Sequence, residues 1–251
     1  MTSSLQALHA SSDRLRHLTG GLSDEQVASP SYCDDWSIAQ VLSHLGSGAV
    51  IARRTLQDAR SGSATPDDFN QSVWDEWNAK TARAQADEAL VADAALVEAF
   101  ESVPESERSG LSFPLGPLSL GFDDYVGLRL NEHVFHTWDI AVALDDTAVL
   151  PEDATALVVD NLGLIARFSG RPDGQERTVT VRTTDPQRHL QVQLSSDGVQ
   201  IDAAEQSPSP DLVLPSEALS RLVYGRLQPD HVPPGADPSI LDSLRAVFPG
   251  P

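Results

Sequence analysis

The chain has 251 residues, and 37 acidic against 17 basic side chains give it a formal net charge of −20. This charge repels nucleic acids and anionic membrane surfaces, so neither is expected as a partner. No segment reaches the roughly 20 apolar residues that span a bilayer, and the first residues lack the apolar run of a signal peptide. We therefore expect a soluble, cytoplasmic protein.

The N-terminal part of the chain has the apolar periodicity of helices, separated by glycine and proline stops. The clearest case runs from Ile38 to Leu45 with i, i+3, i+4, i+7 spacing, and Ser37 precedes it as a helix cap. Segment 104–121 is rich in proline and glycine and is expected to be a loop. The expected helices cover approximately residues 5–19, 23–29, 38–59, 66–103, 123–144 and 151–168.

The composition changes after residue 169, where a polar linker is followed by short segments in which apolar and polar residues alternate. This alternation is typical of half-buried strands. The expected strands lie around residues 179–181, 190–194, 199–201 and 212–214, and further helices around 215–227 and 238–247. The chain is thus predicted to contain a helical domain, residues 1–170, and a smaller α+β domain, residues 171–251.

Cys33 is the only cysteine, so neither an intramolecular disulfide nor a thiolate-rich zinc site is possible. It lies beside Asp34 and Asp35, whose carboxylates disfavour the thiolate that a nucleophile needs. We interpret Cys33 as a loop cysteine without a catalytic role.

His44, Glu132 and His136 are candidate metal ligands. Glu132 and His136 are four residues apart on one predicted helix, so their side chains share a face. His44 lies at the edge of another helix's apolar stripe, and antiparallel packing could bring it opposite that pair. Two imidazoles and one carboxylate suit zinc or another divalent metal ion and leave one position open. Alternatively, the helical pair arises by chance and His44 is a hydrogen-bonded core histidine.

Two neighbours of this pair have different interpretations. Asp139, three residues after His136, could orient that imidazole as an outer carboxylate, or it could be a solvated helix charge. His133 faces away from the Glu132/His136 side of the helix, and we interpret it as structural.

Two sequence blocks that contain these residues, 35–45 and 131–139, resemble the mycothiol-dependent maleylpyruvate isomerase family. This family is a branch of the DinB-like four-helix-bundle metalloproteins. The resemblance implies that His44, Glu132 and His136 bind the metal, and the glutamate at 132 points to this branch. It also implies an N-terminal all-α DinB-like bundle followed by a smaller C-terminal α+β domain.

A third block, residues 221–227, resembles the family's C-terminal motif, whose Gly-Arg pair supplies a functional arginine. The resemblance implies that Arg226 is catalytic, and a guanidinium could bind a substrate carboxylate bidentately across the domain interface. The alternative is a surface arginine that interacts with the dipole at a helix end.

The resemblance further implies that mycothiol, a small thiol of actinobacteria, is the cosubstrate and that zinc activates its sulfur for addition to an electrophilic small molecule. Addition, bond rotation and elimination would then give a maleylpyruvate-type cis–trans isomerisation. A mycothiol S-transferase is a close alternative, and a non-catalytic metal- or ligand-binding protein is another. The sequence does not separate the isomerase from the transferase, nor does it fix the substrate or the oligomeric state.

Overall fold

The structure, a computed structural model, describes residues 3–233 and 236–250. The chain divides into two compact units, Met1–Val149 and Leu150–Pro251. This boundary lies earlier than the one expected at residue 170. The reason is that the helices after Leu150 bury Val159, Leu162 and Ala166 in the apolar core of the second unit.

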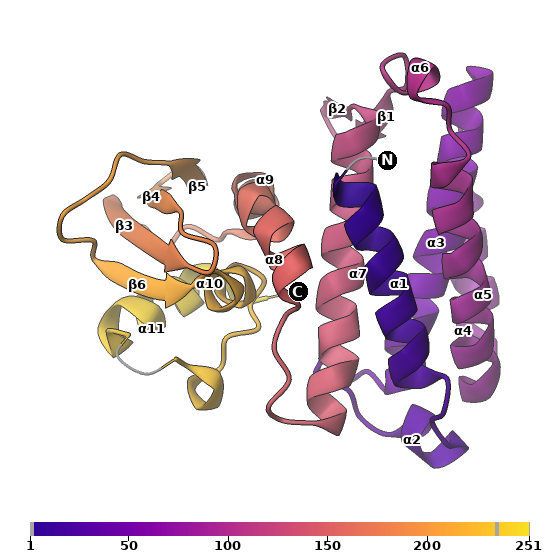
Figure 1. The fold of residues 1–251 in the computed structure, drawn as a ribbon, viewed down its shortest axis with the longest axis horizontal. Helices are drawn as coiled ribbons and strands as arrows, with labels where there is room; N and C mark the ends of the chain where they lie inside the picture. Colours follow the sequence, from indigo (N-terminus) through magenta and orange to yellow (C-terminus); the bar gives the residue numbers. More distant parts are fainter. Residues whose placement is uncertain (1–2, 234–235, 251) are drawn as a thin grey trace. The chain divides into compact units, whose positions relative to one another are not determined.

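The first unit contains four long helices, which lie side by side (Figure 1). Helix α1 packs against α7 and α5, and α3 packs against α5 and α7, which closes a four-helix bundle. The long helices are α1 (Ser3–Thr19), α3 (Ile38–Ser61), α5 (Ala82–Glu101) and α7 (Phe122–Leu144). The shorter elements are α2 (Asp24–Ala28), α4 (Phe69–Asn78), α6 (Glu105–Arg108), β1 (Phe113–Leu115) and β2 (Leu118–Leu120).

Local capping signals fix several of these helix ends. The Ser37 hydroxyl accepts a hydrogen bond from the Gln40 backbone, and the Gln40 side chain bonds back to Ser37, so α3 begins with a capping box. Gly62, with φ +68°, closes the same helix in the left-handed conformation. Ser23 forms a second capping box at the start of α2. The predicted positions of these two helices are confirmed.

Two expectations for the middle of the bundle are wrong. The single helix expected over 66–103 is two helices, α4 and α5, because the Thr81 side chain caps a new helix by accepting from the Ala84 backbone. The expected loop at 104–121 contains α6 and a hairpin of β1 and β2. The hairpin is anchored by Phe113, which is buried and stacks on Tyr125 of α7 with ring centroids 4.2 Å apart.

Helices α3 and α5 approach each other closely at Gly46. A Cβ at this position would overlap the Trp77 ring and lie 2.9 Å from the Ala89 Cα. Trp77 is only 4% exposed, so its ring fills the space that the missing side chain leaves. Glycine at 46 therefore sets the spacing of these helices two residues after His44.

The second unit has a four-stranded sheet of order β5-β4-β3-β6, in which only β6 runs parallel to its neighbour. Its apolar side chains form one core with those of the surrounding helices. The strands are β3 (Arg177–Thr184), β4 (His189–Ser195), β5 (Gly198–Ala203) and β6 (Leu212–Pro215). The helices are α8 (Glu152–Val158), η1 (Val159–Asn161), α9 (Leu162–Ser169), α10 (Ser216–Val223), η2 (Pro229–His231) and α11 (Pro238–Val247).

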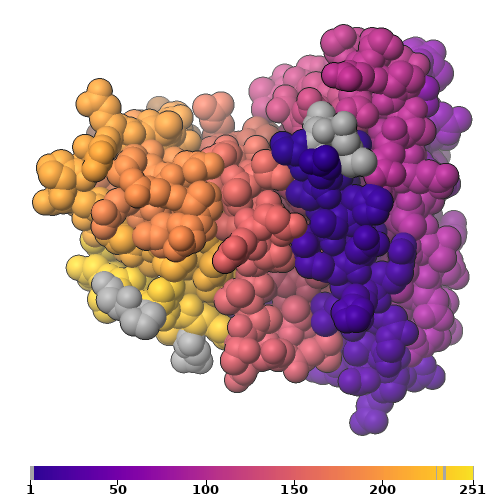
Figure 2. Space-filling view, viewed as in Figure 1, coloured from indigo at the N-terminus to yellow at the C-terminus, as the bar shows by residue number. Residues whose placement is uncertain are grey.

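The predicted fold class, a helical bundle followed by an α+β region, is confirmed. Helix α10 ends at Val223 rather than at the expected residue 227, because the chain turns at Gly225 with φ +70°. Within the described residues, no helix combines the length and the apolar character that crossing a bilayer requires. In the space-filling view, the outer surface of α1 is open to solvent (Figure 2).

Candidate metal centre

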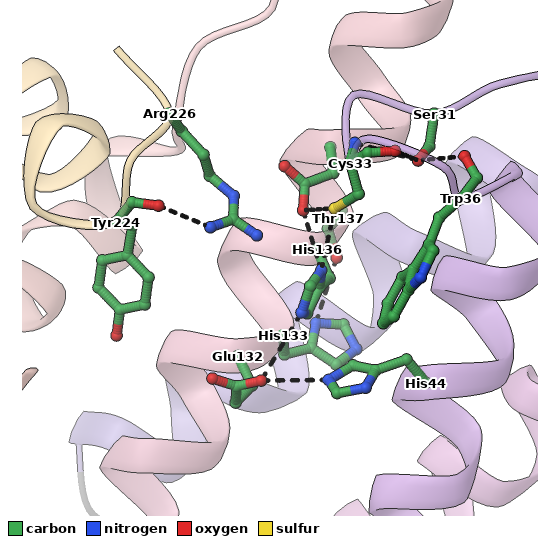
Figure 3. Close-up of polar contacts among 11 residues, drawn as sticks. Ser31, Cys33, Trp36, His44, Glu132, His133, His136, Thr137, Tyr224 and Arg226 are labelled. Atoms are coloured by element: carbon green, nitrogen blue, oxygen red, sulfur yellow. Dashed lines mark hydrogen bonds and ion pairs between the residues drawn. The ribbon is translucent and has the colours of Figure 1, made fainter. Parts of the chain in front are cut away.

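His44 of α3 meets Glu132 and His136 of α7 where these two helices pack against each other (Figure 3). The His44 Nε2 lies 3.3 Å from the Glu132 Oε2, and the His136 Nε2 lies 3.7 Å from the same oxygen. One ligand atom from each residue lies within 4.8 Å of the other two. The structure thus brings together the three residues that the sequence singled out as candidate ligands.

The local sequence explains how these side chains reach one point. Glu132 and His136 are one helical turn apart on α7, so they project from the same face. His44 lies two turns into α3, whose start is fixed by the Ser37 capping box. The packing of α3 on α7 then places His44 opposite the pair, with the imidazole centroids of His44 and His136 4.6 Å apart.

The group is open to solvent on one side. The side chains of His44 and Glu132 are 39% and 47% exposed, whereas that of His136 is 10% exposed. Trp36 flanks the group, and its ring centroid lies 5.4 Å from that of His44 and 6.3 Å from that of His136. An ion held here would therefore have an accessible coordination position beside an aromatic wall.

Asp139 orients His136 from behind. It is fully buried, and its Oδ2 lies 2.9 Å from the His136 Nδ1. When a metal ion replaces the proton on Nε2, this contact keeps the remaining proton on Nδ1 and directs the Nε2 lone pair at the ion. Of the two interpretations of Asp139, the outer carboxylate agrees with this geometry and the solvated helix charge does not.

The charges in this cluster reinforce one another. Burial disfavours the imidazolium, but the hydrogen-bonding partners Asp139 and Cys33 and the nearby Glu132 carboxylate outweigh it and raise the pKa of His136 to about 10. Partial burial also opposes the Glu132 carboxylate, but the nearby His136 imidazolium and the hydrogen bond from His44 hold the pKa of Glu132 well below its usual range. The carboxylate therefore attracts a proton or a cation to this point. A divalent ion would replace the proton on the imidazole.

Cys33 has a contact that the sequence analysis missed. Its thiol donates to the Asp139 Oδ2 at 3.0 Å, and its Sγ lies 4.0 Å from the His136 Nδ1. Cys33, His136 and Asp139 thus form a second group with metal-ligand atoms close together. The two residues in contact are 106 positions apart, and no local pattern indicates such a pairing.

The donor chemistry favours the first group as the metal site. In the second group, the His136 Nδ1 and the Asp139 carboxylate already bind each other at hydrogen-bond distance. In the first group, the His136 Nε2 points towards a half-exposed carboxylate at a distance too long for a good hydrogen bond. Two imidazoles and a carboxylate also match the ligand sets of catalytic zinc sites.

Two further residues that the sequence singled out, His133 and Arg226, have defined contacts within their own units. His133 faces away from the site and is fully buried, with Nε2 3.1 Å from the Asp93 Oδ2 and Nδ1 2.8 Å from the Ser11 Oγ. Arg226 belongs to the second unit, where its Nη1 donates to the Tyr224 carbonyl at 2.9 Å (Figure 3).

Comparisons with known proteins agree with the fold. The family profile of the mycothiol maleylpyruvate isomerase N-terminal domain matches residues 8–141, which include all three candidate ligands. No curated protein matches the chain. Two solved structures do: the crystal structure of the mycothiol-dependent maleylpyruvate isomerase and that of a histidine-to-alanine mutant of it.

Both structures are 13% identical to this chain. The first has a TM-score of 0.64 with 90% of each chain covered, and the mutant has 0.65 with 92% of each chain covered. At this identity the structural likeness establishes a shared fold over nearly the whole length. Since the domain match spans more than half of the sequence, the chain belongs to the mycothiol maleylpyruvate isomerase family.

Proposed function

We propose that the protein is a zinc enzyme that uses mycothiol as a thiol cosubstrate and adds it to an electrophilic small molecule, as in maleylpyruvate cis–trans isomerisation. The observation that carries this proposal is the convergence of His44, Glu132 and His136 at a solvent-open point of the bundle. Membership of the mycothiol maleylpyruvate isomerase family supports this proposal.

The chain's own residues would prepare the site. His44, Glu132 and His136 would hold the ion, and Asp139 keeps the His136 Nε2 free to bind it. A bound Zn²⁺ would supply a Lewis acid that lowers the pKa of a thiol in the open position. The Trp36 ring would restrict access of water on one side of that position.

Arg226 is proposed to bind a carboxylate of the electrophilic substrate. A guanidinium offers paired N–H donors that match a carboxylate, and lysine does not reproduce this fork. Replacement of Arg226 by Ala or Lys is expected to lower kcat/KM roughly 10- to 150-fold. This loss corresponds to the free energy of the hydrogen bonds between the guanidinium and the charged substrate carboxylate. Steady-state kinetics with maleylpyruvate and mycothiol would measure this loss.

Elemental mass spectrometry tests the metal site directly. The purified protein is expected to contain or take up near-stoichiometric zinc, and His44→Ala and Glu132→Ala to lose it while circular dichroism shows them folded. His17→Ala and Glu98→Ala are matched controls because both side chains are exposed elsewhere on the bundle. A parent protein that neither contains nor accepts zinc would contradict the proposal.

A Cys33→Ser variant decides between the two metal-ligand groups. If His44, Glu132 and His136 hold the ion, this variant keeps its zinc. Loss of zinc in Cys33→Ser with retention in His44→Ala would assign the ion to the second group instead.

Cobalt substitution separates an enzyme from a binding protein. In cobalt-loaded Cys33→Ser, which has no protein thiol, a sulfur-to-cobalt charge-transfer band is expected only after mycothiol is added. Such a band would report thiolate binding at the open position. An unchanged spectrum would favour the alternative, a non-catalytic metal- or ligand-binding protein.

Mass spectrometry of the products separates isomerisation from S-transfer. In isomerisation the thiol adds to a conjugated double bond and leaves again, so substrate turns over without accumulation of an adduct. In S-transfer the carbon–sulfur bond persists, and the adduct accumulates in step with thiol consumption. We expect the first result with maleylpyruvate.

A further inference from the structure

The turn that carries Arg226 is a structured helix cap. Helix α10 ends at Val223, after which the Gly225 N–H donates to the Leu222 carbonyl at 3.0 Å and the Arg226 N–H to the Arg221 carbonyl at 2.6 Å. These two bonds, with Gly225 at φ +70°, form a Schellman motif. The motif fixes the direction in which the chain, and with it Arg226, leaves the helix.

A second segment packs against this turn from outside. Residues 248–250 follow α11, and a Cβ on Gly225 would overlap the Gly250 Cα and lie 3.0 Å from the Pro249 carbonyl carbon. Gly225 is therefore required twice, for its left-handed backbone and for the close approach of another chain segment. The second requirement has nothing to do with ending a helix.

Helix α11 also forms a hydrogen bond with Leu227, the residue after Arg226. The Arg245 Nε donates to the Leu227 carbonyl at 2.6 Å, while its Nη1 binds Asp242 one turn back. A cavity of about 200 Å³, lined in part by Gly225, Leu227 and Arg245, lies beside the turn. Without these contacts the turn would have space into which it could shift.

We propose that Gly225 and Arg245 are positioning residues for Arg226, and that α11 with residues 248–250 is the platform that fixes its turn. This inference rests on the proposed role of Arg226. The Arg226 Nη1 donates to the carbonyl of Tyr224 in its own turn, so the orientation of the guanidinium follows the backbone there. Displacement of a substrate-binding group by 1 Å can cost about 100-fold in rate.

Hydrogen exchange at the Arg226 amide tests the platform without any activity assay. Exchange is expected to accelerate at least about 10-fold in Gly225→Ala and Arg245→Gln, since the bond to Arg221 would open more often. Gly174→Ala is the control for backbone strain, because Gly174 has φ +78° but a Cβ added to it would meet no atom within 4 Å. Asp242→Asn is the control for Arg245.

Arg245→Lys is the conservative variant in the same hydrogen-exchange measurement. Its ammonium group can still donate to the Leu227 carbonyl, so exchange at the Arg226 amide is expected to stay near the parent value. Equal exchange rates at the Arg226 amide in the test variants and their controls would overturn the proposal that α11 and residues 248–250 fix this turn.

A double-mutant cycle on kcat/KM tests whether the platform acts through Arg226. Gly225→Ala and Arg245→Gln are each expected to lower kcat/KM roughly 10- to 100-fold with zinc content unchanged. In an Arg226→Ala background they should cause no further loss. Additive losses would overturn the positioning role. Full activity of Arg226→Ala would instead refute the proposed function of that arginine, and the exchange result would still decide the platform.

Discussion

Helix α7 carries two histidines three residues apart that have different surroundings. On one face, both ring nitrogens of His133 have partners inside the bundle, a serine hydroxyl at 2.8 Å and the Asp93 carboxylate at 3.1 Å. On the other face, the His136 Nδ1 lies 2.9 Å from the Asp139 Oδ2, whereas the His136 Nε2 lies 3.7 Å from the Glu132 Oε2. The first cluster is closed, and the second opens to solvent.

Burial and a carboxylate partner do not distinguish these histidines, because both have them. The difference lies in the second ring nitrogen, which is satisfied in His133 and aimed at a half-exposed carboxylate in His136. Under the proposed function, the incompletely satisfied nitrogen of His136, rather than its position in the core, distinguishes the metal ligand from the structural histidine. If so, the closed cluster should control stability and the open one metal affinity.

The largest expected effect comes from breaking the closed cluster. Asp93→Asn removes the carboxylate beside the His133 Nε2, and it leaves Arg129, whose Nη2 lies 3.5 Å from the Asp93 Oδ1, without its buried counter-charge. Loss of one partner from such a group typically costs about 3–5 kcal/mol, and urea unfolding of the zinc-free protein would measure it. Asp87→Asn, exposed on the same helix, should change the free energy of unfolding by less than about 0.5 kcal/mol. A destabilisation below about 1 kcal/mol for Asp93→Asn, or a loss of zinc from its folded form, would contradict the assignment of stability to the closed cluster and metal affinity to the open one.

The next effect is the pH dependence of this cluster. Burial disfavours the Asp93 carboxylate, but His133, Arg129 and a hydrogen bond from Ser12 outweigh it and hold the pKa of Asp93 well below its usual range. Its contribution to stability is therefore complete above the unfolded pKa of about 3.9 and disappears as the pH falls below that value. Zinc-free parent protein should lose stability more steeply below about pH 4 than Asp93→Asn does. Parallel curves in acid-unfolding experiments would show that Asp93 does not titrate in this way.

A smaller effect is expected from the support of the open cluster. Asp139→Asn removes the charge that orients His136, and such outer-shell changes typically lower metal affinity roughly 10- to 100-fold. Competition with a zinc chelator would measure the change. Asp124→Asn, exposed near the start of α7, is the matched control and should leave the affinity unaltered. Equal affinities would mean that Asp139 only packs behind the site.

The sequence predicted those parts of the fold that depend on local signals. Ser37 and Gly62 bound α3 through caps that involve only neighbouring residues, and both ends lie close to the predicted positions. The break between α4 and α5 was missed because the sequence signal that marks it, the Thr81 cap, is a single residue. The β1–β2 hairpin was missed because its strands have three residues each and depend on packing of Phe113 against Tyr125.

The same division applies to the candidate site. The shared face of Glu132 and His136 follows from helical geometry and could be predicted. The contact between Cys33 and Asp139 joins a loop to a distant helix and could not. Even the flanking position of Trp36, which lies just before α3, depends on how that loop folds back over His44.

The close approach at Gly46 has a consequence for how sequences of this kind can diverge. Any side chain there would have to displace the Trp77 ring or the Ala89 backbone, and the adjustment would move the segment of α3 that carries His44. Gly46 is not itself a candidate ligand, yet a substitution at this position would affect the site by shifting the helix that carries His44. Substitutions at 46 and 77 should therefore be tolerated as compensating pairs, with a larger residue at one position matched by a smaller one at the other.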